Sequence, residues 1–68
     1  MIAYRYLTGP DNPEFCQRVT GMLNRGWTLA GPPTLTYDAA REAVICGQTL
    51  TKEKSDLEYD PEISLESF

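Results

Sequence analysis

One stretch, residues 23–29, constrains the fold of this chain more than any other, because it joins the end of a helix to the start of a strand. Helical periodicity ends just before Gly26, and glycine readily adopts the left-handed conformation that closes a helix. Trp27 and Leu29 then alternate with the polar Thr28, which is the period of a strand. Trp27 is the only tryptophan, and we expect it to supply the largest apolar surface of the core.

The segment before this junction is predicted to be a helix over residues 13–25. Asn12 is a suitable N-cap, because its side-chain oxygen can accept a backbone N–H, and Pro13 suits the first helical position. Apolar residues at i, i+4, i+7 and i+8 define one helix face. They are Phe15, Val19, Met22 and Leu23. Gly21 weakens the helix by up to ~1 kcal/mol relative to alanine and would permit a strand or a second subunit to approach closely.

Three extended segments are predicted, at residues 2–8, 27–37 and 42–51. The first has Tyr4 and Tyr6 at alternate positions, and its aromatic content favours a strand. The second is interrupted by Pro32 and Pro33, which cannot donate to a sheet ladder. The third is almost continuously apolar, which is typical of a central strand.

These segments predict an α+β fold with the order β-α-β-β. If the third strand lies between the other two, the sheet is three-stranded and antiparallel, in the order 1-3-2, and the helix packs on one face. We assign residues 1–54 to a single α+β domain and residues 55–68 to an acidic, flexible C-terminal tail. The uncovered sheet face leads us to expect a homo-oligomer, a dimer or larger, or contact with another protein.

Charge is distributed unevenly along the chain. Residues 1–54 carry six basic and five acidic side chains, whereas residues 55–68 carry five acids and no base. The bases are scattered: Arg5, Arg18, Arg25, Arg41, Lys52 and Lys54. A phosphate-binding face needs clustered Lys and Arg, so we expect no nucleic-acid partner.

The tail also contains apolar residues, which leave a second interpretation open. They are Leu57, Tyr59, Ile63, Leu65 and Phe68. In that interpretation the tail is an arm that packs on a neighbouring subunit rather than a flexible end.

The residue types present exclude several kinds of site. With no histidine and two cysteines, the chain cannot form a histidine-containing zinc site, a four-cysteine site or a triad that depends on histidine. Cys16, near the start of the helix, is a candidate reactive thiol, but it borders the apolar face and is assigned a packing role, as is Cys46. We therefore predict no enzymatic activity, no metal and no cofactor.

No stretch approaches the ~20 apolar residues that span a bilayer. The N-terminal residues have Arg5 in their middle and do not resemble a signal peptide. We expect a cytoplasmic protein with no membrane contact.

Four runs of residues carry a resemblance to a known family: residues 4–11 (YRYLTGPD), 15–19 (FCxRV), 23–35 (LNxGWxLxGxPTL) and 44–48 (VICGQ). The chain resembles a small bacterial family that is known only as domain of unknown function number one-seven-three-seven, over about residues 3–53. The resemblance implies a compact α+β domain without an assigned activity, and it supplies no catalytic residues to transfer.

Two functions follow as hypotheses. The first is a non-enzymatic module that self-associates or binds another protein. The alternative is an oligomeric binder of a flat small ligand that uses the aromatic residues Trp27, Tyr4, Tyr6 and Tyr37. A β-α-β-β chain of this size with a tryptophan after the helix is similar in architecture to dodecin, a flavin-storing oligomer, although the wider sequence pattern of dodecin is missing.

Overall fold

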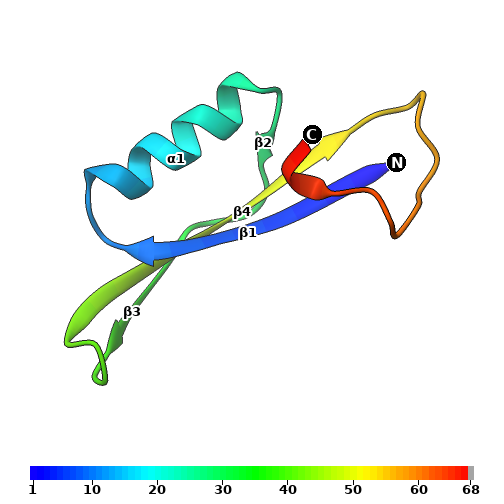
Figure 1. Cartoon of the computed structure of the whole chain (residues 1–68). Helices are drawn as coiled ribbons and strands as arrows, with labels where there is room; N and C mark the ends of the chain where they lie inside the picture. The colour runs from blue at the N-terminus through cyan, green and yellow to red at the C-terminus, as the bar shows by residue number, and fades with distance from the viewer. Residues whose placement is uncertain (68) are drawn as a thin grey trace.

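One antiparallel sheet and one α-helix make up the fold (Figure 1). The structure, a computed structural model, describes residues 1–67. Its elements are β1 (Ile2–Pro10), α1 (Pro13–Asn24), β2 (Thr28–Leu29), β3 (Thr34–Asp38), β4 (Ala43–Glu53) and a short 3-10 helix, η1 (Leu65–Ser67). The α+β class, the single α-helix and the antiparallel sheet are confirmed.

The long strand β4 is the centre of the sheet. It pairs with β1 along one edge, from Ile2 opposite Glu53 to Pro10 opposite Ile45. Both β2 and β3 pair with the other edge of β4. The predicted three-stranded sheet in the order 1-3-2 is therefore wrong, because the sheet has four strands, in the order β1-β4-β2 with β3 also on β4.

The extra strand arises because residues 30–33 break the second predicted segment into two. Gly31 has a φ of 82°, which turns the chain out of the extended conformation. Pro32 and Pro33 follow it and have no N–H to donate to β4. The buried Gln48 side chain bonds the chain at this break, since its Nε2 donates to the Gly31 carbonyl at 3.2 Å.

The predicted signals that bound α1 are confirmed. The Asn12 side-chain oxygen accepts a hydrogen bond from the Phe15 backbone N–H at 3.0 Å. At the other end, Gly26 has a φ of 95°, the left-handed conformation expected of it. Lys52 of β4 donates to the Arg25 carbonyl at 2.7 Å, which satisfies one of the carbonyl groups that a helix end leaves unpaired.

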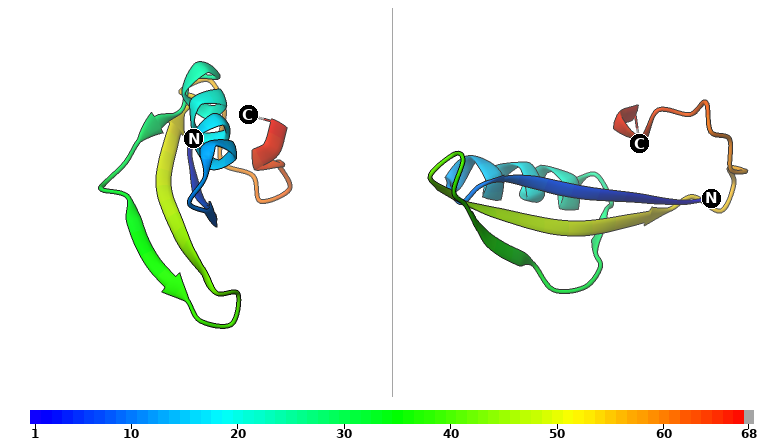
Figure 2. Two further views of the ribbon diagram at one scale, coloured as in Figure 1. Left: turned by 90° about the vertical axis from the view of Figure 1, so that its left-hand side faces the viewer. Right: turned by 90° about the horizontal axis from the view of Figure 1, so that it is seen from below.

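The core lies between α1 and one face of the sheet, close to β1. Its buried apolar residues are Ala3, Leu7, Met22, Trp27 and Leu50. Trp27 is 3% exposed, as its predicted place in the core requires. Figure 2 shows α1 lying along β1 and β4, while β2 and β3 diverge from it. The β2–β3 side of this face is therefore left uncovered.

The acidic tail leaves the end of β4 and turns back past β1 toward the helix side of the sheet (Figures 1 and 2). Its first turn is held by the amino group of Met1, which donates to the Lys54 and Leu57 carbonyls at 2.8 and 2.7 Å. Leu65 packs against the core of its own chain. The flexibility of the tail stays a prediction, and Phe68 lies outside the described residues.

Candidate functional site

The sheet face opposite α1 is the first candidate site, and we call it the open face. Residues that pair directly across an antiparallel sheet share a face, so the register defines its members. They are Ile2, Tyr4, Tyr6, Thr8, Thr28, Thr34, Thr36, Ile45, Thr49 and Thr51. Charged residues of the paired strands occur on this face only near its ends, at Asp38 and Glu53.

Three large side chains stand out in one row along β1. The exposed fractions are 70% for Ile2, 58% for Tyr4 and 46% for Tyr6. Alternation along a strand explains the row, because Ala3 and Leu7 point to the opposite face and are buried in the core. The open face therefore presents an aromatic and β-branched surface with no charge in its middle.

Tyr6 is held in place by two neighbours on this face. Its hydroxyl lies 2.6 Å from Thr34 Oγ1, so the side chain reaches from β1 across β4 to β3. Gly47 of β4 lies beneath it and is buried, and a Cβ there would collide with the Tyr6 hydroxyl and lie 2.7 Å from Thr34 Oγ1. A glycine at this position thus lets Tyr6 lie flat on the sheet.

The structure does not bring the four predicted ligand-binding residues together. Trp27 is buried in the core, so its ring is not available for stacking on a ligand. Tyr4 and Tyr6 share the open face, whereas Tyr37 pairs with Val44 and lies on the other face. The use of these four residues on one ligand stays a prediction, and the geometry of a single chain does not favour it.

An apolar groove lies on the uncovered side of the helix face, between α1 and the β2–β3 edge. Its volume is about 320 Å³. It is lined by Phe15, Cys16, Val19, Thr20, Leu29, Pro33, Cys46, Gly47 and Gln48. The sequence patterns did not predict this groove. It forms because α1 lies nearer to β1 than to β2, and periodicity does not show where a helix lies across a sheet.

The two cysteines have free thiols and different surroundings in this groove. Cys16 is exposed, whereas Cys46 is half-buried and its Sγ donates weakly to the Gly9 carbonyl at 3.5 Å. Burial raises the pKa of the Cys46 thiol, and the negative charge of Asp11 raises it further. A raised thiol pKa lowers the thiolate fraction, so this arrangement does not activate Cys46 as a nucleophile.

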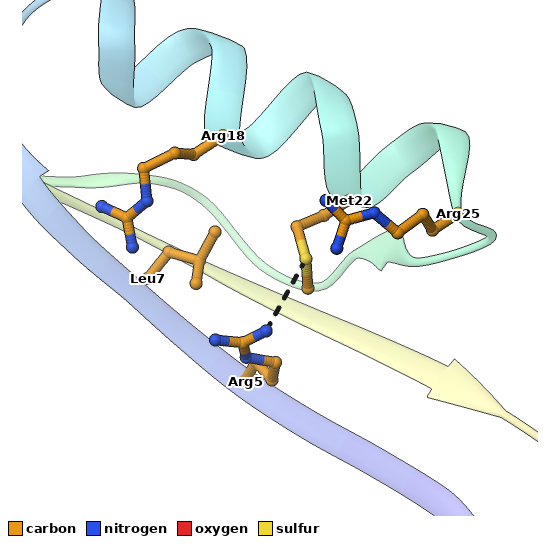
Figure 3. A pocket seen from close by; sticks show the side chains of 5 residues that line it. All are labelled: Arg5, Leu7, Arg18, Met22 and Arg25. Carbon is orange, nitrogen blue, oxygen red and sulfur yellow. Dashed lines mark hydrogen bonds between the residues drawn. The ribbon is translucent and has the colours of Figure 1, made fainter. Parts of the chain in front are cut away.

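A second cleft lies on the other side of α1, between the helix and β1, and three arginines line it (Figure 3). Arg18 and Arg25 come from α1 and Arg5 comes from β1, with Leu7 and Met22 as the apolar wall. These arginines lie far apart in the sequence. Two signals could have found them: Arg18 and Arg25 are seven residues apart, which is two helical turns, and Arg5 alternates with the outward-facing tyrosines of β1.

Some sites and elements are absent from the described part of the chain. Residues 1–67 contain no group of three Cys, Asp or Glu side chains placed to hold a metal ion. Over the same residues, no helix has the length and apolar character needed to cross a membrane.

Comparison with known proteins identifies the family. A model of the family described as domain of unknown function DUF1737 matches residues 1–53. The chain belongs to the DUF1737 family. The match begins at Met1 and ends at Glu53, the last residue of β4, so the DUF1737 domain includes the whole sheet, α1, the open face and all three arginines of the cleft. The acidic tail follows the matched segment.

No match was found among curated proteins or among solved structures. The likeness of this DUF1737 chain to dodecin is therefore not shown. The family match establishes a domain of unknown function and the structure shows its α+β fold, so any function has to be argued from its surfaces.

Proposed function

We propose that this DUF1737 domain is a non-enzymatic self-associating module, in which a second copy of the chain packs on the open face. The observation that carries the proposal is the exposed row of Ile2, Tyr4 and Tyr6 on a face whose middle holds no charge. Interface cores are depleted of charged residues and enriched in tyrosine, so this composition is typical of a surface that binds protein.

The shape of the chain supports a partner of this kind. The exposed surface is 4958 Å², whereas a folded monomer of 7.6 kDa exposes ~4,300 Å². The radius of gyration is 13.7 Å, whereas a compact domain of this length has ~11 Å. Among residues 1–67 the core cluster has five buried apolar residues, so the single chain buries little, and a second copy would add the burial that a small domain lacks.

Packing of two open faces follows the ordinary geometry of stacked sheets, which lie ~10 Å apart with interdigitating side chains. Tyr4 and Tyr6 supply large, rigid contact areas with a polar end. The surrounding threonines supply methyl groups and hydroxyls that can exchange hydrogen bonds across the interface. A twofold arrangement would place the same patch on both copies and close the assembly as a dimer.

A second candidate function is the binding of a flat apolar ligand, and the groove between α1 and β2–β3 is the observation that favours it. Its volume of about 320 Å³ is in the range of small-molecule pockets, and its walls are largely apolar. The residues that would contact such a ligand are Phe15, Val19 and Leu29 rather than Trp27. Titration with riboflavin, followed by the methyl NMR signals of Val19 and Leu29, tests this function; unchanged signals at saturating ligand would contradict it.

Sedimentation equilibrium of the full chain and its variants tests the self-association. We expect the unmodified chain to form a dimer or a larger species at micromolar concentration. Tyr4→Glu places one carboxylate on each side of the interface, and like charges that face one another in an interface cost several kcal/mol. We therefore expect this variant to dissociate at least ~10-fold more readily.

Two matched controls identify the face that is involved. Tyr37→Glu makes the same change on the opposite face, where Tyr37 is 62% exposed, and Tyr59→Glu makes it in the tail, where Tyr59 is 74% exposed. Both are expected to keep the association of the unmodified chain. Equal dissociation of all three variants, or a strictly monomeric unmodified chain, would contradict the proposal.

A further inference from the structure

The three arginines beside β1 direct their guanidinium groups into one cleft. Its volume is about 160 Å³. Figure 3 shows Arg18 and Arg25 reaching from the helix and Arg5 rising from the strand, with the heads around Leu7 and Met22. The Arg25 side chain turns back along α1 toward Gly21, where a Cβ would lie 3.6 Å from its Nη2.

Within residues 1–67, none of these three arginines forms an ion pair with a carboxylate. Within the described residues the one ion pair joins Arg41 to Asp38, far along the sheet in the β3–β4 turn. The hydrogen bonds of the cleft arginines are few: Arg18 Nη1 donates to the Thr8 carbonyl at 3.0 Å, and Arg5 Nη1 lies 3.8 Å from the Met22 sulfur, a weak acceptor. Because each guanidinium has five N–H donors, most of them are left for a ligand.

We propose that this cleft binds a single phosphate group, either free phosphate or the phosphate of a small monoester. A guanidinium fork matches two phosphate oxygens at once, and three forks from different directions suit a tetrahedral anion with a charge near −2. The cleft, with a volume of about 160 Å³, has room for a group of that size. Leu7 and Met22 form an apolar floor beneath the three guanidinium groups.

A phosphate group of a small molecule fits this chain better than a nucleic acid does. A nucleic acid contacts a protein along a basic stripe, whereas these three arginines form a small cluster around Leu7 and Met22. The five carboxylates of the tail give the chain a net charge of −4, which repels a long polyanion. The binding of a small anion in the cleft depends on the nearest charges, because physiological salt screens charges that lie more than ~8 Å away.

Isothermal titration with inorganic phosphate tests the proposal on the full chain, with sodium chloride held at equal ionic strength. The variants are Arg5→Gln, Arg18→Gln and Arg25→Gln, and the matched control is Arg41→Gln, which removes the same charge outside the cleft. We expect saturable binding that each cleft variant weakens by about tenfold or more, because charge-assisted hydrogen bonds are lost. The control variant is expected to bind as the unmodified chain does.

Further measurements distinguish free phosphate from a phosphate monoester and test the role of the guanidinium geometry. Tighter binding of phenyl phosphate than of inorganic phosphate would assign a monoester as the ligand, and the reverse order would assign free phosphate. Arg18→Lys keeps the charge but loses the fork, so it is expected to bind more weakly than the unmodified chain if the geometry matters. Circular dichroism establishes that each variant is folded.

Two results would overturn the proposal. One is the absence of saturable phosphate binding by the unmodified chain. The other is equal weakening by Arg41→Gln and the cleft variants, which would show only non-specific attraction. The cleft lies on the helix side of the sheet and the open face on the other, so a failure here leaves the proposed self-association untouched.

Discussion

The Tyr6 hydroxyl lies 2.6 Å from Thr34 Oγ1, across the buried Gly47 of the central strand. This hydrogen bond ties the N-terminal strand β1 to β3 at the opposite edge of the sheet. It also holds one of the two open-face tyrosines flat over the sheet, where a second copy would meet it. The conformation of the proposed interface therefore depends on the absence of a side chain at position 47.

Gly47→Ala is expected to destabilise the fold and to displace Tyr6. The added Cβ would collide with the Tyr6 hydroxyl and lie 2.7 Å from Thr34 Oγ1, and overpacking of this kind typically costs ~1–3 kcal/mol. Urea denaturation measures the change in the free energy of unfolding. Tyr6→Phe is the matched control, because it removes the hydrogen bond without a collision and is expected to cost less. Unchanged stability of Gly47→Ala would contradict the described packing.

Gly21→Ala is expected to have the opposite effect. Gly21 lies inside α1, and the nearest atom to an added Cβ is the Arg25 Nη2 at 3.6 Å, an ordinary contact distance. Alanine is favoured over glycine in a helix interior by up to ~1 kcal/mol, so thermal unfolding should shift to higher temperature. A lower unfolding temperature would show that another molecule approaches α1 at this position.

Asn12→Ala is expected to destabilise the protein by ~1 kcal/mol, because it removes the side-chain oxygen that accepts the Phe15 N–H at the start of α1. Asn24→Ala is the matched control at the other end of the helix, where the amide is exposed and donates to the Thr20 carbonyl. We expect that change to alter the free energy of unfolding by less. Chemical denaturation compares the two, and equal losses would argue against a specific N-cap.

Cys46 is expected to react more slowly with iodoacetamide than Cys16 at mildly alkaline pH. Burial and the charge of Asp11 raise the pKa of the Cys46 thiol, and the thiolate is the reactive form. The alkylation rate of Cys46 should therefore rise at higher pH than that of an ordinary thiol. Peptide mass spectrometry across a pH series measures both sites in one sample.

Two further results are expected from the raised pKa of the Cys46 thiol. Asp11→Asn removes a negative charge that raises this pKa, so the pH profile of Cys46 alkylation should move toward lower pH. Because the folded pKa is raised, the folded state favours the protonated thiol, and this contribution to stability is lost as the pH rises through the folded pKa. Labelling of Cys46 at the rate of a free cysteine would contradict the assignment.

Local sequence signals predicted most of the elements correctly. Asn12 and Pro13 start α1, Gly26 follows its end, and alternate residues of β1 lie on two different faces. These features depend on a few neighbouring residues, so they are readable from the sequence. The interruption at Pro32 and Pro33 was predicted, but its division of the segment into β2 and β3 was missed, because prolines in a strand are also compatible with a kink or a bulge.

The charged cleft was missed for a different reason. Apolar residues occur on both faces of β1, since Leu7 alternates with Tyr4 and Tyr6, and the pattern did not decide which face meets the helix. Arg5 lies beside the helix arginines because the face of β1 that carries Leu7, and not the face that carries the tyrosines, packs against α1. The groove likewise depends on where α1 lies across the sheet, which is a property of tertiary packing rather than of periodicity.

The most direct test of self-association is isotope-filtered NOE spectroscopy on a mixture of ¹³C-labelled and unlabelled chains, which detects only contacts between copies. Packing of two open faces predicts intermolecular NOEs from the rings of Tyr4 and Tyr6 to threonine methyl groups of the second copy. The absence of intermolecular NOEs at millimolar concentration would contradict self-association. Intermolecular NOEs confined to Leu35, Tyr37 and Val44 on the opposite face would contradict the assignment of the open face.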